Sequence, residues 1–456
     1  MDKKDIYSII RDLKPLLNKT CQFIWEHPEI SEHEKLSSQY YKSEFIKHGF
    51  SIKEDKNNNY SFYGEYGNGK PVIAILGEYD ALPGLSQKVS VSKEAIIEHG
   101  AGHGCGHNLL GASAFIAALA IKNYLEISHI KGTIRFYGCP AEEILKGKVD
   151  MIAHHMFDDC DVALSWHPSD VNMVHDQAYL ANMSIKFHFS GKTSHAAFAP
   201  ERGRSALDAV ELMSVGCNYL REHVIDKVRI HYTTDSGDFS PNIIPDKASA
   251  WYIIRAPKRE DVKEVARRVE LVAKGAALMS ETSVSIEHGY GTCELKENNA
   301  FADLYYQNLL EANKPVYTKE ELDFAREIQN TIDKNVVKHA KTSYKQDQVL
   351  FSDVASRDCW KDNLVTASSD SGDVSYVIPT GLFNTVCWPI GIAPHTWQAT
   401  ACSGSTIGEK GALYAAKVLA GSAYDLLNKP DILKKIQDEF NKRNDGTYKP
   451  MLPDSN

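Results

Sequence analysis

The spacing of apolar residues changes several times along the first half of the chain. Apolar residues recur at helical spacing over residues 5–27, and a second helix is predicted over residues 32–48. Residues 51–53 and 60–66 then alternate between apolar and polar, which is typical of strands with one exposed face. Residues 71–77 form a continuous apolar run of strand length, which predicts a strand buried on both faces.

Strand and helix patterns then alternate as far as about residue 170. A long apolar helix is predicted after Asn108, and it is followed by a strand over residues 131–139, a short helix over residues 149–156 and a strand over residues 162–168. Each strand ends in polar residues. Strands that are joined through helices run parallel in one sheet, so this order predicts a mostly parallel sheet with helices on both faces.

A different order of elements begins near residue 180. Strands are predicted over residues 183–190, 228–234, 247–256 and 282–288, and helices over residues 203–223 and 259–279. The order β-α-β-β-α-β is the ferredoxin-like arrangement. We therefore predict an inserted domain over residues 181–295.

The predicted fold class is α/β, with a mostly parallel-sheet catalytic domain and an inserted ferredoxin-like α+β domain. The catalytic domain consists of residues 1–180 and 296–456 in this prediction. Its second part begins with a helical region over residues 298–338. The sheet domain is expected to resume at Asp362 and to end with an amphipathic helix over residues 408–427.

The composition narrows the class of protein. The 456 residues are 43% hydrophobic and 24% charged, as in a globular protein with two domains. The formal net charge is -9 and no run of Lys or Arg stands out, which argues against nucleic-acid binding. The apolar helix after Asn108 is interrupted at Lys122 and Asn123, so we expect no membrane span. Nine cysteines without framework spacing indicate reduced thiols and a cytoplasmic protein.

The segment His103-Gly104-Cys105-Gly106-His107-Asn108 carries the first candidate chemistry. Cys105 and His107 are metal-ligand types that flank a glycine, and Asn108 stands where the N-cap of the following helix is expected. A thiol near a helix N-terminus is more easily ionised, because the dipole and the free N–H groups favour its anion. Two ligand types at this spacing are a weak signal by themselves.

Other segments add ligand types at the ends of predicted elements. These are Glu78 and Asp80 after the strand at 71–77, Glu142 and Glu143 after the strand at 131–139, His167 at the end of the strand at 162–168, and His395 in a Pro-His-Thr-Trp segment. Open α/β sheets place their sites at the carboxyl ends of strands. The adjacent pair Glu142-Glu143 suits metal-assisted hydrolysis, in which one carboxylate binds a metal and the other takes a proton from a water molecule.

Structural roles are alternatives for several of these residues. Glu78 and Asp80 also fit a capped loop, and Pro394-His395 also fits a turn. His103 is a possible member of the site, whereas Cys139 and Cys160 are expected to be buried thiols.

Four motifs in order resemble one known family. They are Cys-Gly-His-Asn-Leu-Leu-Gly at 105–111, Ser-Gly-Lys-Thr-Ser-His-Ala-Ala at 190–197, Gly-Asp-Val-Ser at 372–375 and His-Thr-Trp-Gln at 395–398, together with Pro140-Ala141-Glu142-Glu143. The chain thereby resembles the dinuclear metal-dependent amidohydrolases and metallopeptidases, which include aminoacylases and auxin-conjugate hydrolases. The resemblance covers nearly the whole chain and is greatest for the p-aminobenzoyl-glutamate hydrolase subunit type.

The resemblance implies roles for individual residues. The metal ligands would be Cys105, His107, Glu143, His167 and His395. Glu142 would be the general base. His195 would reach the active site of a partner subunit and stabilise the oxyanion of the tetrahedral intermediate, while Asn242 and Arg255 would hold a substrate carboxylate.

The chain departs from the family pattern at one strand end. Many relatives carry His-x-Asp there and use the His as a ligand, whereas this chain has Glu78-Tyr79-Asp80. The thiolate of Cys105 would replace the missing ligand, and Asp80 would then support a ligand without binding metal. A sulfur ligand favours Zn²⁺, while the carboxylates and imidazoles also suit Mn²⁺, so both metals stay open.

The predicted function is hydrolysis of an amide bond in N-acyl or N-aroyl amino acids or dipeptides, by metal-activated water with Glu142 as general base. By the resemblance, the inserted domain would be a lid and would form a homodimer or a pair with a related subunit. Alternatives are a dipeptidase of other specificity, a thiol enzyme with Cys105 as nucleophile and His107 as base, and a non-catalytic ligand-binding or regulatory protein on the same fold. A zinc deaminase is disfavoured, because the chain lacks the Pro-Cys-x-x-Cys segment.

Overall fold

The structure is a computed structural model that describes residues 1–58, 60–175, 179–360, 367–444 and 446–454. The chain forms two compact units. Unit 1 contains Met1–Gln177, Lys296–Leu364 and Val374–Tyr448, and unit 2 contains Ala178–Leu295, Val365–Asp373 and Lys449–Asn456. Asp362, where the sheet domain was expected to resume, lies outside the described residues.

Unit 1 is built on a seven-stranded sheet in the order β1-β2-β4-β3-β5-β11-β6. Its strands are β1 (Ser51–Glu54), β2 (Phe62–Asn68), β3 (Val72–Glu78), β4 (Gly132–Cys139), β5 (Val162–Ser169), β6 (Met173–His175) and β11 (Thr380–Val386). The central strands β4, β3, β5 and β11 are parallel, while β1, β2 and β6 pair antiparallel toward the edges. The mostly parallel sheet expected from the sequence is confirmed.

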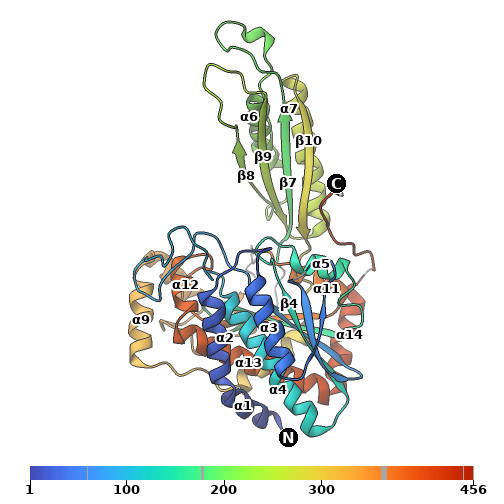
Figure 1. Ribbon diagram of the computed structural model, residues 1–456, viewed down its shortest axis with the longest axis vertical. Coiled ribbons are helices and arrows are strands. Elements are labelled where there is room, and N and C mark those ends of the chain that lie inside the picture. Colours follow the sequence, from blue (N-terminus) through green and yellow to red (C-terminus); the bar gives the residue numbers. More distant parts are fainter. Residues whose placement is uncertain (59, 176–178, 361–366, 445, 455–456) are drawn as a thin grey trace. The chain divides into compact units, whose positions relative to one another are not determined.

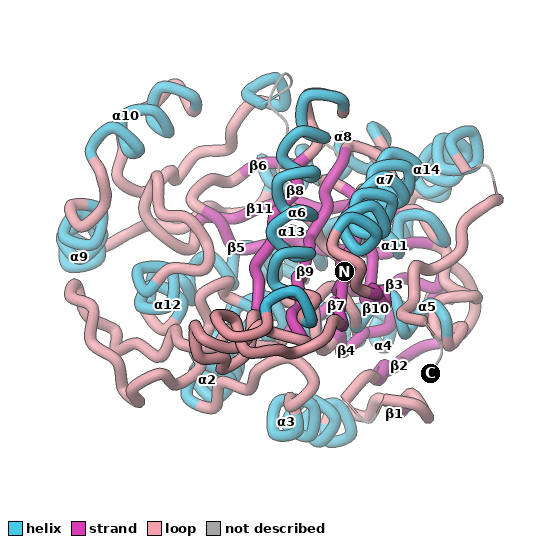
Figure 2. The backbone as a smooth tube through the Cα atoms, turned by 90° about the horizontal axis from the view of Figure 1, so that it is seen from above, coloured by secondary structure: helices cyan, strands magenta, loops and turns pink. Residues whose placement is uncertain are grey.

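Helices surround this sheet in unit 1. They are α1 (Lys3–Asp12), α2 (Lys14–Glu26), α3 (Lys35–Lys47), α4 (His107–Ser128), α5 (Gly147–Ala153), α8 (Asn299–Glu311), α9 (Lys319–Gln329), α10 (Lys334–Ser343), α12 (Trp397–Ser403), α13 (Thr406–Asn428) and α14 (Pro430–Arg443), with a 3-10 turn at Arg357–Trp360. Helix α11 (Ser371–Val377) begins in unit 2 and ends in unit 1. Figure 1 and Figure 2 place α9 and α12 at one side of unit 1, and α5 and α14 at the opposite side.

The single helix expected over residues 5–27 is two helices in the structure. Leu13 ends α1 and precedes α2, and Pro15 lies in the first turn of α2. Proline suits a first turn because it has no N–H to leave unpaired there, but inside a longer helix the same residue would break a hydrogen bond. The break therefore has a cause that the apolar spacing alone does not reveal.

Strand β3 is buried on both faces, as its continuous apolar run predicts. Ile73 and Ile75 belong to the core that contains α4, whereas Ala74 and Leu76 belong to a second cluster with Met151 of α5. Helix α4 is long and apolar enough to cross a membrane by length and composition, but 78% of its most apolar window is buried inside the protein. In this structure it is a core helix that packs against α13, β3 and α2.

Unit 2 is an antiparallel four-stranded sheet with helices on one face. The strands β7 (Ala181–Ser190), β8 (Arg229–Asp235), β9 (Lys247–Ala256) and β10 (Ser283–Thr292) lie in the order β10-β7-β9-β8. Helices α6 (Ala206–Leu220) and α7 (Arg259–Met279) cover one face (Figure 1), and short 3-10 turns lie at Pro200–Arg202 and Arg221–His223. In β7, Phe187 and Phe189 face these helices, whereas Lys186 and His188, which alternate with them, are exposed. The chain order and the strand order agree with the expected ferredoxin-like arrangement.

Gly111→Ala tests the close approach of α4 to β3. A Cβ at Gly111 would lie 2.6 Å from the Glu78 backbone O, which the sheet holds in place. We expect the variant to lose about 2 kcal/mol of unfolding free energy through overpacking, measured by denaturant titration. Gly275→Ala in α7 is the matched control, because no described atom lies within 4 Å of a Cβ there, and it should gain up to about 1 kcal/mol. Equal stabilisation by both substitutions would contradict the close approach.

Candidate active site

The segments that carry the candidate ligands meet at one edge of the sheet in unit 1. Strands β3, β4 and β5 run parallel, so their carboxyl ends share this edge, and Glu78 lies opposite Cys139 in the register. The residues that follow β4 are Pro140-Ala141-Glu142-Glu143, and His167 lies near the end of β5. The parallel sheet therefore brings Glu78, the Glu142-Glu143 pair and His167 together although they are far apart in the sequence.

The glycine between Cys105 and His107 lets the chain turn into α4. Gly106 adopts a left-handed conformation with φ +75°, and α4 begins at His107. Asn108 is therefore inside the helix and is not the N-cap that its position suggested. Its side-chain amide instead donates to the Cys21 and Ser403 carbonyls at 3.2 and 3.0 Å, in the buried core. Asn108 thus fixes the start of α4 by bonds to distant segments.

The His107 ring is fully buried and is oriented by Asp80. His107 Nδ1 lies 2.8 Å from Asp80 Oδ1, and Asp80 Oδ2 accepts hydrogen bonds from Ser31 Oγ at 2.8 Å and Glu143 N at 2.9 Å. Buried carboxylates commonly fix metal-binding histidines in this way. The sequence left open whether Asp80 belongs to the site or only caps a loop. Its contact with His107 shows that it does more than cap a loop.

The other nitrogen of His107 faces three carboxylates. His107 Nε2 lies 3.3 Å from Glu78 Oε2, 3.9 Å from Glu142 Oε2 and 4.0 Å from Glu143 Oε1. Both His107 Nε2 and Glu143 Oε1 are buried without a hydrogen-bond partner among the described residues. Buried polar atoms are normally paired, and opposed unpaired nitrogen and oxygen atoms suit a bound cation.

Cys105 lies beside two further imidazoles and a carboxylate. Its Sγ is 3.3 Å from His167 Nε2, while His167 Nδ1 lies 2.7 Å from the Pro168 carbonyl oxygen. His395 Nε2 lies 3.2 Å from Glu143 Oε2, and the His395 N–H donates to the Gly104 carbonyl at 2.9 Å. The His395 side chain is 55% exposed, whereas the Glu143 side chain is 6% exposed.

The ligating atoms form three overlapping groups in which all atoms lie within 4.8 Å of one another. The groups are Cys105, His107 and His167, then Cys105, Glu143 and His395, and then Glu78, His107 and Glu142. Cys105 and His107 each belong to two groups, which is the arrangement that neighbouring ions with a shared ligand require. A donor set of sulfur, nitrogen and oxygen fits Zn²⁺, and its imidazoles and carboxylates also fit Mn²⁺.

Burial controls the ionisation of the thiol and of the adjacent histidine. Burial and the Glu143 carboxylate raise the pKa of the Cys105 thiol well above its usual value. The helix N-terminus thus does not ionise Cys105 on its own, because desolvation of the anion is the larger effect. Burial and nearby His107 lower the pKa of His103 to about 3. Its Nε2 lies 3.0 Å from the Ile24 carbonyl, so His103 is a neutral core histidine beside the site.

Glu78 has an ion-pair partner that the sequence did not suggest. Glu78 Oε1 lies 2.7 Å from Lys148 Nζ, and both side chains are buried. Burial by itself would raise the pKa of Glu78, but the attraction of Lys148 and His107 outweighs it and lowers that pKa. Lys148 lies in the second position of α5, one residue before the helix expected from the sequence, and no ligand-type pattern marks it.

The predicted residues of the inserted domain lie in unit 2. The His195 ring is exposed, its Nδ1 accepts from the Ala197 and Phe198 N–H groups, and its backbone pairs with Ile243. The Ala196 N–H donates to the Asn242 carbonyl at 2.9 Å, so His195 and Asn242 are neighbours.

Arg255 is not brought to these two residues within one chain. It lies at the far end of β9, where its Nη1 donates to Ser368 Oγ at 3.4 Å. At roughly 3.3 Å a residue, β9 places Arg255 about 26 Å from Lys247. The segments of His195 and Asn242 adjoin the Lys247 end, where the Gly191 N–H donates to the Asp246 carbonyl. The structure therefore does not bring the two residues together within one chain, and their role in holding a substrate carboxylate stays a prediction.

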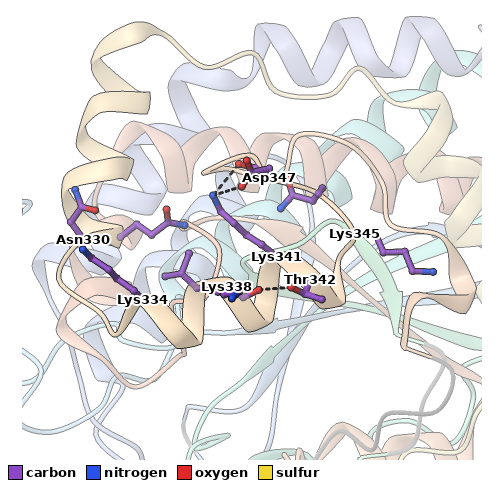
Figure 3. Close-up of a pocket in the computed structure, with 10 residues that line it drawn as sticks. Asn330, Lys334, Lys338, Lys341, Thr342, Lys345 and Asp347 are labelled. Carbon is purple, nitrogen blue, oxygen red and sulfur yellow. Dashed lines mark hydrogen bonds and ion pairs between the residues drawn. The ribbon is translucent and has the colours of Figure 1, made fainter.

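A hollow of about 690 Å³ beside α10 has a different character. It is lined by Lys334, Lys338, Lys341 and Lys345 among others, and Figure 3 shows Lys341 turned toward Asp347, with an N–O distance of 3.0 Å. Lys334, Lys338 and Lys341 are spaced along α10 and Lys345 follows its end, so they form a basic cluster although the sequence has no run of basic residues. The hollow lacks the thiol, imidazoles and paired carboxylates of the candidate active site.

Comparisons with known proteins identify the family. Residues 180–278 match the peptidase dimerisation domain of the M20 family. The chain is 40% identical over 433 residues to a p-aminobenzoyl-glutamate hydrolase subunit of Escherichia coli (strain K12), and the match covers 91% of this chain and 90% of that protein. The chain belongs to the M20 family of metallopeptidases and amidohydrolases. As an M20 protein it is a hydrolase of amide bonds.

Other M20 relatives are more distant. Xaa-Arg dipeptidase of Mus musculus is 30% identical over 376 residues, covering 81% of this chain and 73% of that protein. A Bacillus subtilis protein described as a dinuclear metal binding peptidase from the M20 family has the same fold, with a TM-score of 0.60, 17% identity, and coverage of 92% of this chain and 99% of that chain. An aminobenzoyl-glutamate utilization protein from Klebsiella pneumoniae matches with a TM-score of 0.63, 16% identity, and coverage of 92% and 97%. The M20 fold and its dimerisation domain are thus present in this chain.

Cys105→Ser tests the thiol that two ligand groups share. Replacing sulfur by a neutral hydroxyl removes a strong ligand but little volume, so we expect metal content to fall clearly while the melting temperature of the metal-free protein stays within about 2 °C of wild type. Metal analysis after dialysis and thermal unfolding are the measurements. Full metal content and full activity in Cys105→Ser would show that Cys105 is a buried thiol without a role as a ligand.

Proposed function

We propose that this M20 protein uses two divalent metal ions to hydrolyse the amide bond of N-aroyl or N-acyl amino acids of the p-aminobenzoyl-glutamate type. The observation that carries this proposal is the buried His107 Nε2, which has no hydrogen-bond partner in the described part of the chain and faces Glu78, Glu142 and Glu143 within 4.0 Å. The choice of substrate rests on the 40% identity to the E. coli hydrolase subunit over nearly the whole of both chains.

The proposed ligands are Cys105, His107, Glu143, His167 and His395. Cys105 belongs to two of the three ligand groups, which supports a shared thiolate between the ions. Bound divalent ions lower the pKa of a water molecule, stabilise the coordinated thiolate and polarise a carbonyl oxygen. Asp80 orients His107 and does not bind metal in this proposal, in agreement with its contact to Nδ1.

Glu142 is the proposed general base. Its carboxylate is nearly buried and faces His107 Nε2, next to the proposed ligand Glu143. It takes a proton from the attacking water and passes it to the nitrogen of the leaving amino acid, which then departs as a neutral amine. The adjacent residues divide the work, since Glu143 binds metal and Glu142 moves the proton.

His195 is proposed to act in the active site of a partner subunit. There it donates a hydrogen bond to the developing oxyanion. Its exposure in unit 2, and the dimerisation domain over residues 180–278, support a homodimer formed through unit 2. Asn242, a neighbour of His195, would serve the same active site of the partner subunit. Arg255 lies at the other end of β9 and would hold the substrate carboxylate in a different active site. A pair with a related chain is the alternative, because two different E. coli proteins similar to this chain are named as subunits of p-aminobenzoyl-glutamate hydrolase.

The remaining alternatives have less support. A dipeptidase is the second candidate, because Xaa-Arg dipeptidase is 30% identical to this chain. A thiol nucleophile at Cys105 is disfavoured, because burial raises its pKa. A non-catalytic binding protein would not need both Glu142 and Glu143. All nine cysteines are free, which supports work in a reducing compartment such as the cytoplasm.

A substrate screen tests the proposed specificity. p-Aminobenzoyl-glutamate, hippurate, acetylated amino acids and Xaa-Arg dipeptides are incubated with enzyme loaded with Mn²⁺, Zn²⁺ or Co²⁺, and released amine is measured. We expect the aroyl-amino acids to give the highest kcat/KM, and a chelator but not a thiol-alkylating agent to abolish it. Preference for Xaa-Arg would favour the dipeptidase, and no hydrolysis of any compound would favour a binding protein.

The pair Glu142→Gln and Glu143→Gln separates base from ligand. Glu142→Gln should lower kcat by about 10²–10⁴-fold with metal content intact, because a proton acceptor is lost. Glu143→Gln should lower metal content together with activity. Turnover and metal analysis on the same preparations are the measurements, and near-normal turnover of metal-loaded Glu142→Gln would rule out Glu142 as the base.

A further inference from the structure

The buried ammonium of Lys148 contacts the candidate active site without belonging to any ligand group. Its Nζ lies 2.7 Å from Glu78 Oε1, and the two side chains are 0% and 4% exposed. A buried ion pair pays a large desolvation penalty, and apolar residues of similar size often stabilise a fold as well. A pair kept at the edge of the site therefore suggests a local role beyond stability.

The backbone holds Lys148 in this position. A Cβ at Gly147 would lie 1.7 Å from the Pro140 carbonyl oxygen, so only glycine permits α5 to begin so close to the segment that follows β4. The same segment continues into Glu142 and Glu143, and Ala141 and Leu145 there adopt left-handed conformations. Lys148, next to Gly147, is thereby held close to this segment, where its ammonium reaches Glu78.

The two oxygens of Glu78 have separate partners. Oε1 contacts Lys148, and Oε2 lies 3.3 Å from His107 Nε2, which no described residue pairs by a hydrogen bond. Two ligands bound at about 2.0–2.2 Å to one tetrahedral ion lie roughly 3.3–3.6 Å apart. The separation of Glu78 Oε2 and His107 Nε2 therefore suits two ligands of one cation.

We propose that Lys148 is a positioning residue of the metal centre, which binds one oxygen of Glu78 and thereby aims the other at the ion held by His107. Glu78 is then an additional oxygen ligand at the strand end where the family pattern has a histidine. Lys148 also offsets one of the four carboxylate charges of Glu78, Asp80, Glu142 and Glu143. This inference rests on the proposed metal-dependent function and adds a ligand and its support to that site.

The test compares metal affinity in variants that leave no buried charge unpaired. Glu78→Gln combined with Lys148→Met removes both charges at nearly constant volume. The dissociation constants for Mn²⁺ and Zn²⁺ are measured by competition with a chelator, and melting temperatures are measured on the metal-free proteins. We expect the double variant to fold like wild type and to bind its weakest-held ion at least about 10-fold less tightly, as for other residues that support metal ligands.

A second buried pair provides the control. Lys3 Nζ lies 2.7 Å from Asp425 Oδ2 in the same unit, and these side chains are 14% and 4% exposed. Lys3→Met combined with Asp425→Asn should leave the metal dissociation constants unchanged. If it weakens metal binding as much as the Glu78 and Lys148 double variant does, a general loss of stability explains both, and the proposal is wrong.

Two further results would overturn the proposal. Wild-type affinity in a well-folded Glu78→Gln, Lys148→Met variant would show that the pair only stabilises the fold. If that variant fails to fold, Glu78→Asp decides, because it keeps the charge and shortens the ligand arm, and unchanged affinity would then reject Glu78 as a ligand. If the wild-type protein binds no ion, the proposed function itself is wrong. This failure is distinguishable from failure of the Lys148 proposal, because it is seen in the wild type before any variant is compared.

Discussion

The fixed orientation of the His107 ring is the constraint on which the candidate active site depends. The ring is fully buried at the start of α4, and Asp80 takes its Nδ1 at 2.8 Å, so Nε2 has one direction in which to point. That direction is set by three features of the chain: the left-handed Gly106, the bonds of Asn108 to Cys21 and Ser403, and the packing of α4 on β3. A thiol, imidazoles and carboxylates from separate segments then surround a buried nitrogen that lacks a hydrogen-bond partner among the described residues.

The electrostatics of this edge of the sheet explain why a cation belongs there. Four carboxylates, Glu78, Asp80, Glu142 and Glu143, surround one imidazole, and like charges at such distances strongly disfavour one another in a buried setting. Lys148 offsets part of this charge by its contact with Glu78. Divalent ions would offset the rest and would also reverse the neutral state that burial imposes on the Cys105 thiol. Metal binding and ionisation of the ligands are therefore coupled.

The sequence predicts those parts of the fold that follow from local pattern. The apolar run at 71–77 and the β-α-β-β-α-β order after residue 180 predict a parallel sheet and a ferredoxin-like domain, and both are found. The sequence does not predict β6, which has three residues, or β11, whose apolar positions are interrupted by Gly381 and Asn384. In the site, Glu78, Glu142, Glu143 and His167 stand out because they lie at strand ends, and Cys105 and His107 because they precede a long apolar helix. Lys148 does not, because a buried lysine is recognisable only from its ion pair, which is a tertiary contact.

Anomalous diffraction from crystals of the metal-loaded protein, recorded at the absorption edge of Zn or Mn, tests the two-ion site most directly. We expect two neighbouring peaks, with Cys105 Sγ within bonding distance of both and His107 Nε2 within bonding distance of one of them. Absence of anomalous density among these residues, or density only elsewhere, such as near Asp347 beside α10, would contradict it.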